Sequence, residues 1–128
     1  MRFDHAGIAT EDAERTADLF ADLLDADRVH AEEFDGMRVV FLDLGNGYFE
    51  VLEPLDEEGA IARFLDREGP GIHHLALETE DARAALDRAR GMGIEPIDDE
   101  PRPGAWGHTV AFLHPRDTAG VLVEFVEH

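Results

Sequence analysis

The feature that most constrains this 128-residue chain is an internal repeat. Thr10-Glu11-Asp12-Ala13 recurs as Thr79-Glu80-Asp81-Ala82, and a histidine precedes each threonine at the same spacing, His5 in the first copy and His74 in the second. Further along, residues 39–42 resemble 110–113, and residues 49–53 resemble 123–127. Three matches in the same order, with offsets that grow slowly as loop insertions would make them grow, indicate a duplicated structural unit.

Each copy of the repeat is expected to fold as a βαβββ module. A strand (2–8 or 72–77) runs into a Thr or Asp that can cap a helix, in which apolar residues recur on one face. Three strands should follow in each copy, at about 28–33, 37–43 and 48–53, and then at about 94–97, 107–113 and 120–126. The sequence therefore predicts an α+β fold, in which two tandem βαβββ modules form a curved mixed sheet with a central metal-binding cleft.

A single domain covering residues 1–128 is expected from the length of the chain. Module one should span about 1–55 and module two about 71–128. Between them, apolar residues at 61, 64 and 65 mark a linker helix within about 56–70, bounded by Pro54 and by Gly69-Pro70-Gly71.

Composition excludes several kinds of chemistry. Cysteine is absent, so disulfides, thiolate metal sites and cysteine nucleophiles are ruled out. The net charge of −19 argues against a nucleic-acid partner. No apolar run approaches the length of a membrane span, and the N-terminus lacks a signal-peptide pattern, which predicts a cytoplasmic protein with no membrane partner.

The charge composition also indicates the salt concentration to which the protein is adapted. The chain has 30 acidic residues against 11 basic ones, and every basic residue is an arginine. Molar salt screens the self-repulsion of such a chain, so the composition favours adaptation to a salt-rich cytoplasm over an ordinary acidic protein.

Four side chains form the candidate site. Because successive strand residues face opposite sides, Glu50 and Glu124 should lie on the same faces as His5 and His74, away from the apolar helix-packed face. Two imidazoles and two carboxylates at matched repeat positions would suit a divalent Co, Mn, Ni, Fe or Zn ion. The alternative is that each histidine is a hydrogen-bonded core residue.

The remaining histidines carry less information. His73 should point to the opposite face from its neighbour and have a structural or supporting role. His30 and His128 are expected to be solvated. For His108 and His114, which bracket one predicted strand, substrate contact and a plain structural role are both open.

Nearly the whole chain resembles the vicinal oxygen chelate superfamily (glyoxalase, bleomycin resistance and dioxygenase proteins), and within it the methylmalonyl-CoA epimerases. The resemblance is carried by residues 4–9, 49–55, 61–65, 71–76, 99–107 and 112–124. The first of these segments suggests only the superfamily. The Gly-Ile-His-His segment, the Glu-Pro-Arg-Pro-Gly loop and the His-Pro-Arg run are more specific to the epimerases.

The resemblance implies the vicinal oxygen chelate fold and an enzyme of propionate metabolism that epimerises methylmalonyl-CoA at C2. It places the metal ligands on His5, Glu50, His74 and Glu124, with no separate organic cofactor site, and gives Glu124 a catalytic role as well. The ion would be divalent, cobalt(II) first, with Mn, Ni, Zn or Fe possible, and it would stabilise the enolate formed when the α-proton leaves. An acyl-CoA substrate and a homodimer are the implied partners.

One departure from the family pattern concerns proton transfer. Two bases on opposite faces of the substrate, or one mobile base, must exchange the proton. The family's second proposed acid lies in the strand after Gly36, where residues 38–40 of this chain contain no carboxylate. The second base is therefore unassigned, with water, Glu33 and Asp35 as candidates.

Two other classes of function stay open from the sequence. One is a different metal-dependent activity of the superfamily, glyoxalase-like or dioxygenase-like, whose pocket loops would differ. The other is a non-catalytic small-molecule-binding protein, which would generally lack a complete metal site. Four intact candidate ligands argue against that second class.

Overall fold

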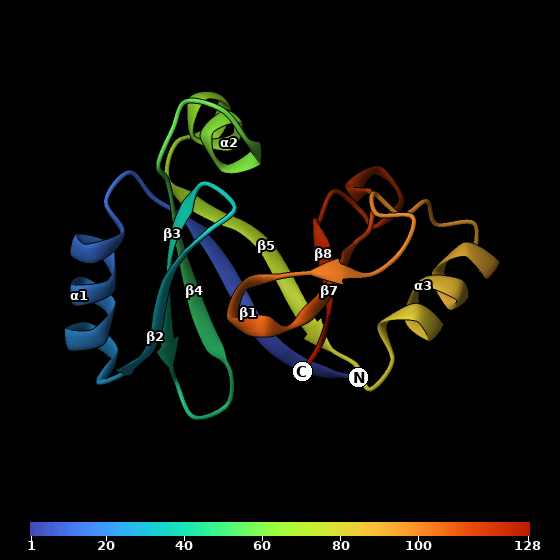
Figure 1. Ribbon diagram of the computed structural model, residues 1–128, viewed down its shortest axis with the longest axis horizontal. Helices are drawn as coiled ribbons and strands as arrows, with labels where there is room; N and C mark the ends of the chain where they lie inside the picture. Colours follow the sequence, from blue (N-terminus) through green and yellow to red (C-terminus); the bar gives the residue numbers. More distant parts are fainter. The chain divides into compact units, whose positions relative to one another are not determined.

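A computed structural model describes residues 1–128, and it contains two copies of one βαβββ arrangement (Figure 1). The first copy consists of β1 (Arg2–Ala9), α1 (Ala13–Leu24), β2 (Asp27–Phe34), β3 (Met37–Asp43) and β4 (Tyr48–Pro54). Its strands lie in the order β2-β3-β4-β1. The pair β1 and β4 is parallel and the other pairs are antiparallel, so the sheet is mixed.

The second copy repeats this plan after the linker helix α2 (Ala60–Glu68). It consists of β5 (Gly71–Glu78), α3 (Ala82–Gly91), β6 (Arg102–Pro103), β7 (Thr109–Phe112) and β8 (Val123–Glu127). The strand order is β5-β8-β7-β6, with β5 and β8 parallel and the other pairs antiparallel. The prediction of an α+β fold made of two βαβββ modules is confirmed.

One face of each module's sheet is covered by its helix. In the first, α1 packs against β3 and β4 through a core that includes Ala17, Val40, Leu42 and Val51. In the second, α3 packs against β7 and β8 through an equivalent core. None of the helices is long and apolar enough to cross a membrane. The opposite face of each sheet is not covered by its helix. The candidate ligands were predicted to lie on that opposite face.

The two helices begin in the same way. Asp12 caps α1 and Asp81 caps α3, each accepting a backbone hydrogen bond from the residue three positions further on. The first residue of each helix also donates its N–H to a glutamate at the end of the module's closing strand, Ala13 to Glu53 Oε1 and Ala82 to Glu127 Oε1, both at 2.8 Å. These equivalent bonds extend the duplication from sequence to local geometry.

An ion pair connects α1 to the edge strand β2. The Arg28 guanidinium lies 2.8 Å from Glu14 and 3.2 Å from Asp18, which are one turn apart on the helix. The hydrogen bond from Arg28 lowers the pKa of Glu14 below its ordinary value. Glu14 and Asp18 are substantially exposed, so the pair orients the helix more than it stabilises the fold.

The predicted strand at about 94–97 is wrong. That segment makes only an isolated bridge between Pro96 and Leu113, and the strand beside β7 is instead the short β6. Pro96 has no N–H to donate, and the N–H of Glu95 is taken by the Asp117 carboxylate. A continuous ladder therefore cannot form there.

The chain divides into two compact units whose borders run through strands. One unit contains Met1–Asp4 and His74–His128, and the other contains His5–His73. The borders fall immediately before His5 and immediately before His74, which are equivalent positions of the repeat. Each unit thus includes a strand end that the sequence assigns to the other module.

Candidate metal centre

In the first module, His5 and Glu50 lie together on the face away from α1. Glu50 is the cross-strand neighbour of Gly7 on β1, and strand alternation places His5 on the same face. His5 Nε2 lies 3.2 Å from Glu50 Oε1. The pair therefore joins two adjacent parallel strands.

In the second module, His74 and Glu124 form the same pair. Glu124 on β8 is the neighbour of Ala76 on β5, again two residues beyond the histidine. His74 Nε2 lies 3.3 Å from Glu124 Oε1. The two pairs thus agree in register, in contact atoms and in distance.

The four side chains are buried although all are polar. Their exposed fractions are 3% for His5, 6% for Glu50, 4% for His74 and 6% for Glu124. Buried carboxylates are costly unless a cation or hydrogen-bond donors compensate them. Burial of this kind in both copies favours a functional pair over chance placement.

The separation within each pair fits shared ligation of a metal ion. Two donors bound at about 2.1 Å are about 3.0 Å apart at a right angle and about 3.4 Å apart in a tetrahedron. The observed 3.2 and 3.3 Å lie between these values. Imidazole nitrogen and carboxylate oxygen are also donors that divalent transition metals accept.

An aromatic ring supports each histidine. Phe41, on the antiparallel strand beside Glu50, meets the His5 ring edge to face with centroids 5.7 Å apart. Phe112 holds the same position beside Glu124 and meets His74 at 5.4 Å. These contacts fix the imidazole orientation and give the pair an apolar wall on one side.

One prediction about the other histidines is wrong. His30 is not simply solvated, because its side chain is 27% exposed and its Nε2 forms a hydrogen bond with Glu32. His128 is exposed, as predicted, and its ring is also bonded to the buried Asp4. On an edge strand and at a strand end, sequence spacing gave no sign of these partners.

The remaining histidines have identifiable neighbours. His73 packs edge to face on Phe64 of α2, which fits the structural alternative. His114 accepts a hydrogen bond from the Arg116 N–H and so caps a short 3₁₀ turn, Pro115–Asp117. His108 stacks on Trp106, and its ring also contacts the His128 ring in a tilted arrangement.

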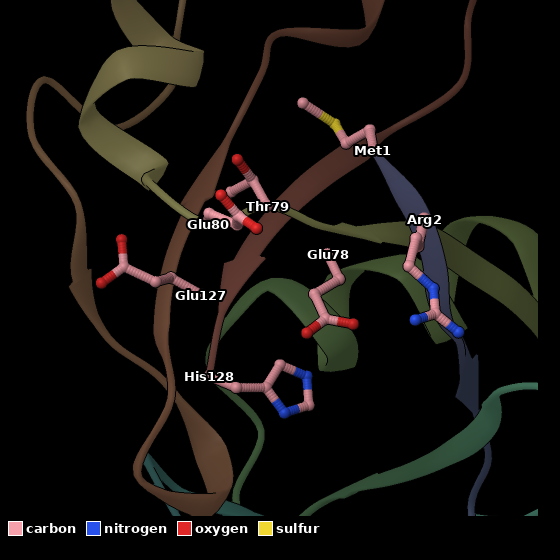
Figure 2. Close-up of a pocket in the computed structure, with 7 residues that line it drawn as sticks. All are labelled: Met1, Arg2, Glu78, Thr79, Glu80, Glu127 and His128. Carbon is pink, nitrogen blue, oxygen red and sulfur yellow. The ribbon is translucent and has the colours of Figure 1, made fainter.

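A separate cavity of about 700 Å³ lies where Met1 and His128 come close (Figure 2). Figure 2 shows the Glu78 carboxylate next to the His128 ring, and Asp4, Glu78 and His128 place potential ligand atoms within 4.8 Å of one another. No equivalent cluster occupies the matching positions of the first module. The bond between Asp4 and His128 is therefore best understood as a contact that fastens the first strand to the last.

Comparison with known proteins connects this geometry to a family. Residues 4–112 match the model of the Glyoxalase/Bleomycin resistance protein/Dioxygenase superfamily. The mitochondrial methylmalonyl-CoA epimerase of Homo sapiens is 37% identical over 96% of this chain and 72% of its own length. The ethylmalonyl-CoA/methylmalonyl-CoA epimerase of Cereibacter sphaeroides is 40% identical over 96% of this chain and 95% of its own length. The chain belongs to the methylmalonyl-CoA epimerase family.

Solved structures of methylmalonyl-CoA epimerases have the same fold. The Mycobacterium tuberculosis epimerase superposes with a TM-score of 0.94 at 36% identity, covering 98% of this chain and 87% of its own. A Streptomyces coelicolor epimerase variant in complex with 2-nitronate-propionyl-CoA gives 0.93 at 36% identity, covering 99% and 96%. The predicted vicinal oxygen chelate fold is confirmed.

Proposed function

We propose that this protein is a metal-dependent epimerase that interconverts the R and S forms of methylmalonyl-CoA at C2. The observation that carries the proposal is the buried histidine and glutamate pair, present at the same register in both modules of a chain from the epimerase family. Relatives from distant organisms carry the same activity in their names. The alternative activities of the superfamily lack this support.

In this proposal one divalent ion is held jointly by His5, Glu50, His74 and Glu124. The separations within the pairs, the burial and the donor types all suit such an ion. When bound, the ion would polarise the thioester and carboxylate oxygens of the substrate and so stabilise the enolate charge. Cobalt(II) is the first choice for its identity, with Mn, Ni, Zn or Fe as alternatives.

The chain itself must orient the substrate and move the proton. Phe41 and Phe112 place apolar rings against the two histidines, which would limit the access of water to a bound substrate. Glu124 is proposed as one of the acid/base groups, on the basis of its position in the family pattern. An acyl-CoA substrate, a homodimeric assembly and a cytoplasmic location complete the proposal.

The direct test follows the C2 proton. Metal-loaded protein incubated in D₂O with a single epimer of methylmalonyl-CoA should incorporate deuterium at C2 and form the other epimer, as measured by NMR and by a stereospecific coupled assay. Ethylmalonyl-CoA should be tested alongside, because the Cereibacter relative is named for both substrates. Chelated protein is the control and should lose turnover. If metal-loaded protein shows neither deuterium exchange nor epimerisation, the proposed function is refuted.

A further inference from the structure

Inversion at C2 requires acid/base groups on both sides of the substrate carbon, or one group that moves between them. Glu124 of the second module is proposed as one of these acid/base groups. A side chain of the first module would then be the second acid/base group. The sequence offers no carboxylate in residues 38–40, so the structure must identify it. The following assignment rests on the proposed function and deepens it.

Strand register shows which side chains share the face of His5 and Glu50. Phe41 is the cross-strand partner of Glu50, and His30 on β2 is the partner of Phe41. Glu32, two residues beyond His30, is the partner of Val39. Because direct cross-strand partners point to the same side of a sheet, His30 and Glu32 lie on the ligand face, opposite to α1.

Contacts within the module strengthen this placement. His30 Nε2 is hydrogen-bonded to Glu32 Oε2, and the His30 ring lies against Phe41, with centroids 6.2 Å apart. The same Phe41 ring also meets the His5 ring. His30 and Glu32 are 27% and 25% exposed at their side chains, so they are held in place and remain partly accessible.

Other carboxylates of the first module are placed less suitably. Glu33 points to the opposite side of β2, is 68% exposed and pairs with Arg38. Asp35 lies in the β2–β3 turn with a left-handed backbone. Asp43 is exposed and accepts the N–H of Gly45, so it stabilises a turn.

Glu32 and Glu50 lie two strand intervals apart on the same face of the sheet. Their strands are separated by β3, and strands are about 4.8 Å apart, so two intervals give roughly 10 Å across the sheet. The residue of β3 facing Glu32 is Val39, which is small and apolar. A carboxylate reaching inward from β2 would approach a bound acyl group from the side away from β4.

We propose that Glu32, oriented by His30, is the second acid/base group of the reaction. In one direction the Glu32 carboxylate takes the C2 proton, and the electrons of the C2–H bond move into the thioester as an enolate. Glu124, in its protonated form, then delivers a proton to the opposite face of C2. Exchange with water restores both groups, and the reverse direction uses the same steps in opposite order.

The test is Glu32→Gln, which keeps the size and hydrogen bonding of the side chain and removes its capacity to accept the proton. Epimerisation should fall by about 10²- to 10⁴-fold, the usual contribution of an acid/base group. In D₂O the variant should still exchange the C2 proton of one epimer, whose C2–H bond faces Glu124, while exchange of the other epimer is lost. Bound metal and melting temperature should match those of the wild type.

Glu33→Gln is the matched control, adjacent in sequence but on the opposite face, and it should epimerise at the wild-type rate. The assignment is overturned if Glu32→Gln retains epimerisation within a few fold of wild type. It is also overturned if exchange falls equally for both epimers, or if the variant loses its metal, since each would show a structural role. Inactive wild-type protein would instead refute the proposed function itself.

Discussion

At the level of single residues, repetition made the ligand pairs predictable and left the His30 and Glu32 pair hidden. Strand alternation within each repeat sufficed to place His5 beside Glu50 and His74 beside Glu124. His30 has no such counterpart, and the register of β2 shifts between Arg28 and His30. A shift of that kind changes which residues meet across strands, and the sequence carries no signal for it.

The repeated pairs give a prediction for single substitutions. His5→Ala and His74→Ala should each abolish metal binding and activity, because each removes a ligand from one shared ion. Metal content per chain should be one in the wild type and near zero in either variant, as measured by elemental analysis after dialysis. His114→Ala, which removes the cap of a 3₁₀ turn and a ring contact with the Arg116 guanidinium, is the control. Retention of metal by one histidine variant alone would contradict a shared site.

At the level of helices and strands, most boundaries followed from periodicity and capping residues. Asp12 and Asp81 begin their helices as their sequence positions suggest. The strand predicted at 94–97 was wrong, because the backbone groups of this segment are hydrogen-bonded to a side chain and to residues distant in the chain. Long-range competition for a backbone N–H is invisible to local patterns.

The equivalent helix bonds give a prediction at this scale. Glu53→Ala and Glu127→Ala should each lower the free energy of unfolding by about 1–2 kcal/mol, since each removes a charged acceptor from a helix N-terminus. Urea unfolding monitored by circular dichroism measures the change. Glu57→Ala, at an exposed position of the linker, should have almost no effect. Equal stabilities for Glu53→Ala and Glu57→Ala would show that the helix bond contributes nothing.

At the level of the whole molecule, charge dominates. The chain has 30 acidic residues and only 11 arginines. Several of these arginines are already paired with carboxylates at the surface, as Arg28 is. Individual surface pairs contribute up to about 1 kcal/mol, which is too little to offset the excess negative charge. The compact state therefore accumulates repulsion that the extended chain avoids.

Salt should consequently stabilise this protein. The melting temperature is expected to rise from tens of millimolar to several molar KCl, because the Debye length shrinks to about 3 Å at 1 M. Calorimetry across the series, at constant metal concentration, measures the effect, since metal loss would itself lower the melting temperature. A melting temperature that stays flat or declines would remove the inference of a salt-rich cytoplasm. It would leave the proposed function unaffected.

The borders of the two compact units lie inside β1 and β5, so each unit is completed by a strand end from the other copy of the repeat. Asp4, encoded at the start of the first copy, is bonded to His128 at the end of the second. A fragment encoding one copy would lack the strand end that the other copy contributes to its compact unit. Although the duplication is plain in the sequence, we therefore expect neither copy to fold into a working unit by itself.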